Sequence, residues 1–121
     1  MKEVSVYIPC FNSSATIKEC LEAVFVQSYP FKEVIVVDDG SLDDTVSIAS
    51  KHPVRIIRHK VNKGLACARN TAINNTESEF LAAIDSDCVL HPDWLKLIMR
   101  RFISPDIAGV GGKLVDKYKD T

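Results

Sequence analysis

Apolar residues along the chain recur in two alternating patterns. Short continuous or every-second-residue runs are typical of strands, and they are followed by stretches in which apolar residues return every three or four positions, as in helices. Residues 4–8 alternate and stop at Pro9, which predicts a first strand. A helix should follow, with one apolar face made of Ile17, Cys20, Leu21, Val24 and Phe25.

The same alternation continues along the chain. Strands are predicted at 34–37, 54–58, 80–84 and 107–115, and helices at 41–50, 64–74 and 92–102. Thr16 with Glu19, and Ser41 with Asp44, are predicted to cap two helix starts. The 64–74 helix should bury Leu65, Ala68, Ala72 and Ile73. We therefore expect a single α/β domain over residues 1–121, a mostly parallel sheet with helices on both faces.

Composition excludes several classes of protein. The 121 residues carry 15 Lys and Arg against 16 Asp and Glu, a net charge of −1 that gives no basic footprint for nucleic acid. Neither an apolar run long enough to span a membrane nor the apolar core of a signal peptide is visible. The four cysteines have no disulfide or zinc spacing, so we expect reduced core thiols and a cytoplasmic protein.

In a parallel sheet, ligands bind beyond the carboxyl ends of the strands. This rule selects four loops as candidate sites: Pro9–Asn12, Asp38–Ser41, His59–Gly64 and Asp85–Asp87. Asp38 and Asp39 should point opposite ways, so that one braces its loop and the other faces a ligand. Asp43 and Asp44, close behind them, are interpreted as turn and helix-cap residues.

Two further features suggest a metal and an anion. Asp85 and Asp87 share a face of an extended segment and can converge on Mg²⁺ or Mn²⁺. Between the acidic loops, residues 51–69 hold six Lys or Arg and no acid, and Asn62-Lys63-Gly64 leads into a helix whose start attracts anions. A nucleotide diphosphate with its metal would suit this arrangement. The three histidines have no partner pattern and are interpreted as structural or surface residues.

The four loops together resemble those of family 2 glycosyltransferases, which are inverting enzymes with the GT-A fold, a Rossmann-like nucleotide-diphospho-sugar transferase fold. The segments that carry the resemblance are Ile8-Pro9-Cys10-Phe11-Asn12, Val36 to Ser41 with Asp43 and Thr45, Asn62-Lys63-Gly64 through Ala68-Arg69-Asn70, and Asp85-Ser86-Asp87. They stand in the order and at the spacing of the family, from Val4 to about Val115. The resemblance implies a nucleotide-sugar donor, UDP-sugar first, and a role in polysaccharide biosynthesis.

The resemblance also implies roles for individual residues. Asp39 would accept a hydrogen bond from the imide N–H of uracil, and Asp38 would brace that loop. Pro9 and Asn12 would edge the nucleotide pocket, and Arg69 would help to close its base-binding wall. Asp85 would contact the ribose or the metal, Asp87 would be the main ligand of Mn²⁺ or Mg²⁺, and the metal would neutralise the departing diphosphate.

One departure from the family concerns the general base. The family's base is a carboxylate well beyond the D-x-D, and the later acids Asp93, Asp106, Asp116 and Asp120 lack its context. We therefore expect this chain to be the donor-binding half of a longer enzyme, inactive alone, with the base beyond Thr121. The full-length protein would take a sugar, glycan or lipid-linked acceptor, at the inner face of the membrane. Self-association through an exposed sheet edge near 107–115 is expected.

Three alternative functions compete with this hypothesis. An inactive nucleotide-binding module fits the same motifs. A haloacid dehalogenase-type phosphatase, with Asp85 as its nucleophile, would place that motif at the start of its domain and needs more chain after it. A nicotinamide-binding domain needs a G-x-G-x-x-G turn after the first strand, where this chain has Cys10-Phe11-Asn12.

Overall fold

The computed structural model describes residues 2–101. The strands are β1 (Val4–Cys10), β2 (Glu33–Asp38), β3 (Arg55–Arg58) and β4 (Phe80–Ala83), and the helices are α1 (Ile17–Phe25), α2 (Thr45–Ala49), α3 (Leu65–Asn74) and α4 (Trp94–Met99). The strand order is β3-β2-β1-β4, and every pairing is parallel. The predicted fold class is confirmed. The strand predicted at 107–115 lies outside the described residues.

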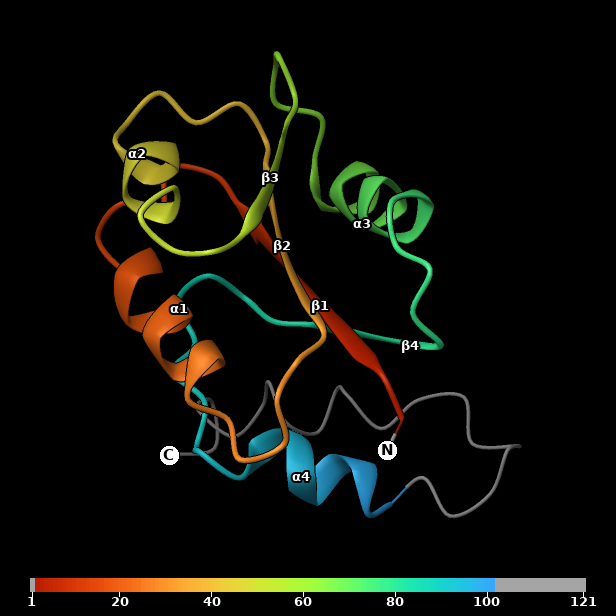
Figure 1. Cartoon of the computed structure of the whole chain (residues 1–121). Helices are drawn as coiled ribbons and strands as arrows, with labels where there is room; N and C mark the ends of the chain where they lie inside the picture. The colour runs from red at the N-terminus through yellow and green to blue at the C-terminus, as the bar shows by residue number, and fades with distance from the viewer. Residues whose placement is uncertain (1, 102–121) are drawn as a thin grey trace.

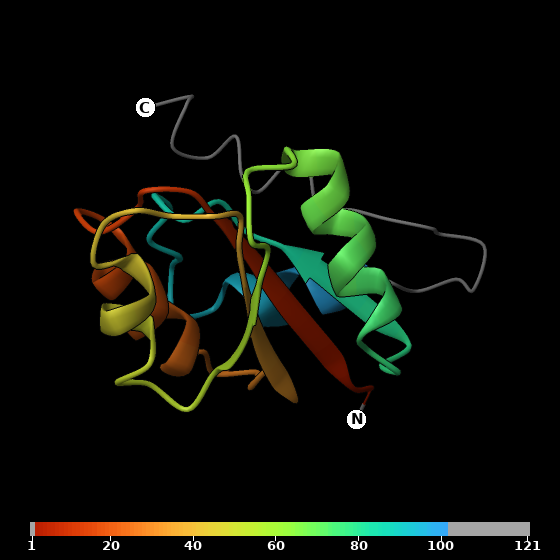
Figure 2. The same ribbon diagram turned by 90° about the horizontal axis from the view of Figure 1, so that it is seen from above.

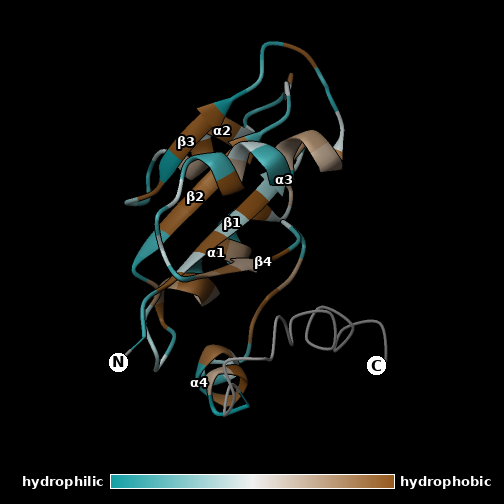
Figure 3. Ribbon diagram, turned by 90° about the vertical axis from the view of Figure 1, so that its right-hand side faces the viewer, coloured by the Kyte–Doolittle hydropathy of each residue, from teal (hydrophilic) through white to brown (hydrophobic). Residues whose placement is uncertain are grey.

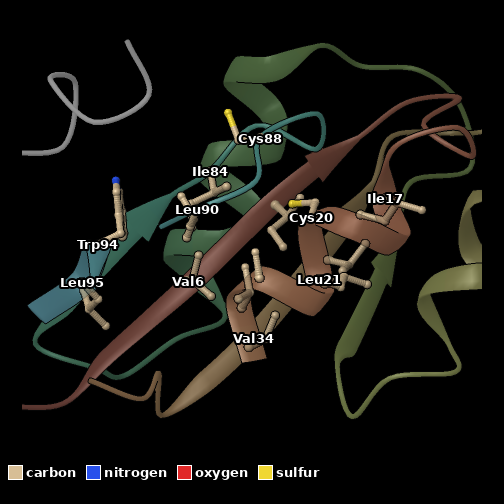
Figure 4. Close-up of a cluster of buried hydrophobic side chains, with 14 of the residues drawn as sticks. Val6, Ile17, Cys20, Leu21, Val34, Ile84, Cys88, Leu90, Trp94 and Leu95 are labelled. Atoms are coloured by element: carbon tan, nitrogen blue, oxygen red, sulfur yellow. The ribbon is translucent and has the colours of Figure 1, made fainter. Parts of the chain in front are cut away.

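Helices cover both faces of the sheet (Figures 1 and 2). On one face α3 packs through Ala68 and Ala72 against Tyr7, Ile35 and Val37. The other face carries the larger core, in which α1, α4 and alternate residues of β1 and β2 meet (Figure 4). Colouring by hydropathy shows brown, apolar strands at the centre of the molecule (Figure 3). Of the helices within residues 2–101, none is long and apolar enough to cross a membrane.

β1 continues through Pro9, where the sequence predicted that it would stop. Cys10 directs its carbonyl toward β2 and accepts the Asp39 N–H, whereas Tyr7 directs its carbonyl toward β4 and accepts the Ile84 N–H. Pro9 therefore faces the β4 side, and the pairing with β4 ends at Tyr7. No ladder hydrogen bond is lost there, so proline is tolerated in a central strand.

Several local predictions were wrong at the helices. Thr16 makes no side-chain cap bond, and its hydroxyl donates to the Ser13 carbonyl. The cap predicted from Ser41 and Asp44 is also absent: α2 begins only at Thr45, Asp44 makes no side-chain cap bond, and the Ser41 hydroxyl accepts from the Asn12 N–H. The predicted core residues Phe25, Leu65 and Ile73 are exposed. Phe25 stacks on the His52 ring at the surface. α3 approaches the sheet through its two small alanines, which leaves Leu65 and Ile73 outside the contact.

Candidate functional site

The loop after β2 lies directly against the loop that leads into α3. Gly40 has φ +80°, and a Cβ at this position would lie 2.9 Å from the Asn62 nitrogen and from the Val61 carbonyl carbon. Only glycine fits both the backbone conformation and the space. The close approach at Gly40 therefore brings together two segments that are more than twenty residues apart in the chain. They form one corner of the site, made of residues 38–41 and 59–64.

Asp39 is the centre of that corner. Its Oδ1 accepts hydrogen bonds from the Lys63 N–H and from His59 Nδ1, each at 2.8 Å, and its Oδ2 accepts from the Gly64 N–H at 2.8 Å. The Asp39 side chain is 8% exposed. The anion that the sequence predicted at the start of α3 is thus the Asp39 carboxylate, and these two N–H groups are not available to a phosphate.

Charge at the corner follows from these bonds. Burial alone would raise the pKa of Asp39, but the hydrogen bonds from His59, Lys63 and Gly64 favour the charged form more strongly, so the pKa lies below its ordinary value. Asp39 is therefore a carboxylate at neutral pH. A carboxylate only accepts hydrogen bonds, so His59 Nδ1 is the protonated nitrogen and donates to it.

Asp38 faces the other side of the sheet and is fully buried. Its Oδ2 accepts from the Ser41 N–H at 3.2 Å and lies 3.3 Å from Arg58 Nε. Burial and these two partners make Asp38 a brace for the 38–41 turn.

The loop after β1 connects the other loops. Asn12, with φ +49°, donates its N–H to the Ser41 hydroxyl and accepts the Leu42 N–H at its side-chain oxygen. The Ser13 hydroxyl lies 2.8 Å from the Ser86 hydroxyl. Residues 12 and 13 therefore join the loop after β2 to the loop after β4.

A pocket of about 350 Å³ opens beside α3, at the ends of β1 and β4. Its lining includes Tyr7, Pro9, Leu65, Arg69 and Asp85. Burial raises the pKa of the Tyr7 hydroxyl, with Arg69 acting in the opposite direction and Asp85 in the same one. A cation and a carboxylate thus share this pocket with an aromatic ring and a proline.

Asp85 and Asp87 follow β4 and are both exposed. With Cys88, their ligand atoms lie within 4.8 Å of one another, close enough to hold one metal ion. No described residue makes a hydrogen bond or ion pair with either carboxylate. Hard cations such as Mg²⁺ and Mn²⁺ take carboxylate oxygens, so these two acids fit such an ion.

Comparison with known proteins identifies the family. The model of Glycosyl transferase family 2 matches residues 5–121. The chain belongs to this family. It is 39% identical to chondroitin synthase of Escherichia coli over 104 residues, 82% of this chain and 15% of that protein. It is 36% identical to glycosyltransferase AglE of Haloferax volcanii over 122 residues, 95% of this chain and 40% of that protein.

Solved structures of glycosyltransferases share the fold. The mannosyltransferase PcManGT of Pyrobaculum calidifontis, in complex with GDP-Man and Mn²⁺, superposes with a TM-score of 0.80 at 30% identity, over 87% of this chain and 33% of that one. TarS 1-349 of S. aureus, in complex with UDP-GlcNAc, gives 0.75 at 33% identity, over 81% and 30%. The chain therefore spans less than half of the length of these relatives. The match to the glycosyltransferase family rules out the phosphatase alternative.

The structure gathers the family 2 residues into separate groups. Pro9, Arg69 and Asp85 line one pocket, and Asp85 and Asp87 form one carboxylate pair. Asp39 lines neither this pocket nor a second one, of about 320 Å³, that is lined by residues 40–42 and 58–60. Asn12, at the surface, connects two loops, and the buried Asp38 braces one of them.

Sequence reasoning missed His59. The sequence shows no partner pattern for this residue, which is interpreted as structural or surface. Its side chain is 9% exposed, not at the surface, and it bonds to both Asp39 and Thr71. Its position was a usable signal, because His59 directly follows β3 at the carboxyl edge of the sheet, one strand away from Asp39. The partner 20 residues earlier in the chain could be found only after the order of β2 and β3 was known.

Proposed function

We propose that the protein of which this chain is the donor-binding half transfers a sugar from UDP-sugar, with inversion at the anomeric carbon, to a sugar, glycan or lipid-linked acceptor at the cytoplasmic face of a membrane. Family membership supports glycosyl transfer. Relatives of the fold are solved with UDP-GlcNAc and with GDP-Man, so the nucleobase has to be inferred from this chain's own residues.

Asp39 carries the inference of uridine. A carboxylate has about four acceptor sites, and three are filled by Lys63, Gly64 and His59. With the partners found among residues 2–101, one site remains, on Oδ2, which suits the single imide N–H of uracil. Adenine has an unprotonated ring nitrogen in place of the imide N–H, so in the same pose that nitrogen and the carboxylate oxygen would be two acceptors in contact; its amino group is a donor, but it lies to one side of this position. Pro9 and Arg69, in the pocket beside α3, would hold the rest of the nucleotide.

Asp85 and Asp87 would hold Mn²⁺ or Mg²⁺ together with the diphosphate. Two carboxylates supply too few ligands for tight binding alone, and phosphate oxygens complete the set. When bound, the ion supplies Lewis-acid neutralisation of the leaving diphosphate. Asp85 lies in both the pocket and the carboxylate pair, which supports a role for it in positioning the donor relative to the ion.

Calorimetric titration of UDP tests the proposal. The chain should bind UDP more tightly with Mn²⁺ than with a chelator, and Asp87→Ala should remove that difference, since metal and nucleotide strengthen each other equally. Asp39→Asn should weaken UDP about ten-fold or more, the loss of one charged hydrogen bond. Equal affinities for UDP and ADP would refute the role of Asp39, and metal-independent binding would refute that of Asp85 and Asp87.

A donor-consumption assay separates the transferase from an inactive nucleotide-binding module. We expect this chain alone to bind the donor without transferring sugar, because the acids Asp85 and Asp87 are assigned to the metal and, among residues 2–101, we assign no other carboxylate as a base for the acceptor. Acceptor-dependent transfer by the chain itself would show that the base lies within it.

A further inference from the structure

His59 is the part of the Asp39 corner whose place the proposed function does not explain. Its ring lies between two elements: Nδ1 is 2.8 Å from Asp39 Oδ1, after β2, and Nε2 is 2.8 Å from the Thr71 hydroxyl, on α3. With Nδ1 donating to the carboxylate, a neutral ring accepts the Thr71 O–H at Nε2. Both ring nitrogens are therefore satisfied, and the hydroxyl fixes the angle of the ring.

The two oxygens of Asp39 are consequently unequal. Oδ1 accepts from both Lys63 and His59, so its two lone-pair sites are filled. Among residues 2–101, Oδ2 accepts from Gly64 and has one site left. The carboxylate can take one more donor, and only at Oδ2.

Nucleobases differ in how many hydrogen bonds they donate to such a carboxylate. Uracil offers one imide N–H, which needs one acceptor site. Guanine offers a ring N–H and an adjacent amino N–H, and the pair binds a carboxylate by using one site on each oxygen. Of these two bases, uracil finds its partner here, while guanine would leave its amino group facing an oxygen that is already saturated.

We propose that His59 is a specificity-determining residue that, by occupying Asp39 Oδ1 under the control of Thr71, makes the site accept uridine and reject guanosine. This rests on the proposed function, in which Asp39 contacts the nucleobase. His59 does not touch the donor; it acts through Asp39 and is a positioning residue. The Lys63 and Gly64 N–H groups hold the carboxylate in place, and His59 decides how many acceptor sites it presents.

Two near-isosteric substitutions separate the hydrogen bond from the shape of the side chain. His59→Asn places an amide nitrogen where Nδ1 was and keeps a donor to Oδ1, whereas His59→Leu has nearly the same shape and no donor. Both lose the bond to Thr71, so that loss cancels between them. Calorimetry with saturating Mn²⁺ would measure the ratio of the GDP and UDP dissociation constants for each.

We expect His59→Leu to lower the GDP/UDP ratio about ten-fold, mainly through tighter GDP binding, because one charged hydrogen bond to guanine becomes possible. His59→Asn should keep the ratio within about three-fold of the unmodified chain, by the same conversion. Thr71→Val, which removes the hydroxyl that holds the ring, should shift the ratio in the direction of His59→Leu by a smaller factor. Equal ratios in the Leu and Asn variants would overturn the proposal.

Controls keep this result distinct from the proposed function. If Asp39→Asn leaves UDP affinity unchanged, the contact between Asp39 and the base fails, and the role of His59 fails with it. If Asp39→Asn weakens UDP but the His59 pair has equal ratios, only the role of His59 fails. Thermal melts identify any variant that does not fold. In that case nitrogen NMR of the unmodified chain at alkaline pH decides, because a hydrogen on Nε2 in place of Nδ1 would overturn the assignment.

Discussion

Two acidic groups at the same edge of the sheet are built in opposite ways. Asp39 is buried and held by two backbone N–H groups and a histidine. Asp85 and Asp87 are exposed, and within residues 2–101 neither carboxylate has a hydrogen-bond or ion-pair partner. The partners that hold Asp39 are in place before any ligand arrives, whereas no described residue occupies the acceptor oxygens of the Asp85–Asp87 pair.

The difference corresponds to the two kinds of ligand that we propose. Recognition of a base edge needs a donor-acceptor pattern fixed in advance, and fixing it early avoids the entropic cost of ordering side chains on binding. A cation needs several oxygens with uncommitted lone pairs, some of which come from the substrate. The stability of the chain should therefore depend on the Asp39 corner, and metal binding on the Asp85–Asp87 pair.

The largest expected effect comes from forcing the Asp39 corner apart. Gly40→Ala adds a Cβ 2.9 Å from backbone atoms of the 61–62 segment, at φ +80°, and should lower the free energy of unfolding by about 3 kcal/mol or more. Gly64→Ala is the matched control, because φ is +94° but nothing lies within 4 Å of the added carbon. It should cost about 1–3 kcal/mol, from the backbone alone, because φ +94° with ψ 168° is a conformation that essentially only glycine adopts. Urea unfolding measures both, and equal losses would show that the corner is not tightly closed.

A smaller loss is expected from the charge of the corner. Asp39→Asn replaces one carboxylate oxygen, which accepts hydrogen bonds, by an amide N–H₂ group, which donates them. One buried donor then loses its acceptor, and the free energy of unfolding should fall by about 1.5–3 kcal/mol. Asp87→Asn, on the exposed pair, should change it by less than about 0.5 kcal/mol. Similar losses in the two variants would contradict the comparison.

The same substitution should change the response to acid. Since the folded-state pKa of Asp39 lies below the ordinary value of 3.8, its contribution is present above that pH and is lost as pH falls through the folded-state pKa. The difference in stability between the unmodified chain and Asp39→Asn should therefore shrink below about pH 4. The difference between the two proteins is compared because the pKa values of Asp43 and Asp93 are also lowered. Both groups remain in the variant, so their contributions to the pH dependence cancel.

The two acidic groups also differ in how far the sequence could predict them. Asp85 and Asp87 were predicted to meet because residues i and i+2 of an extended segment share a face. The structure finds them together, but in a turn beyond β4, in which the Asp85 carbonyl accepts the Cys88 N–H. Alternation also predicted that Asp38 and Asp39 would point to opposite faces. Which partners Asp39 would find was not predictable, because Lys63, Gly64 and His59 reach it only through the pairing of β2 with β3 and the close approach at Gly40.

Predictions of buried residues failed where a helix passes the end of the sheet. Periodicity placed Leu65 and Ile73 in the core, but α3 contacts β1 and β2 through Ala68 and Ala72, and Leu65 instead lines the pocket beside Pro9. Hydrophobic periodicity shows which face of a helix is apolar, but it does not show how much of that face the sheet covers. The alternation of strands and helices was confirmed because it depends on the whole pattern and not on one contact.

The smallest expected effect tests the connection between the two groups. The bond between the Ser13 and Ser86 hydroxyls ties the Asp85–Asp87 loop to the loop that also contacts the 41–45 segment. Ser86→Ala should weaken Mn²⁺-dependent UDP binding by about two- to ten-fold, the value of one neutral hydrogen bond, and leave metal-free UDP binding unchanged. Ser50→Ala removes an equivalent hydroxyl bond at the end of α2 and is the control. Calorimetry with Mn²⁺ and with chelator separates the outcomes. An equal loss in both conditions would mean that Ser86 supports the base corner as well, and that the two groups are not independent.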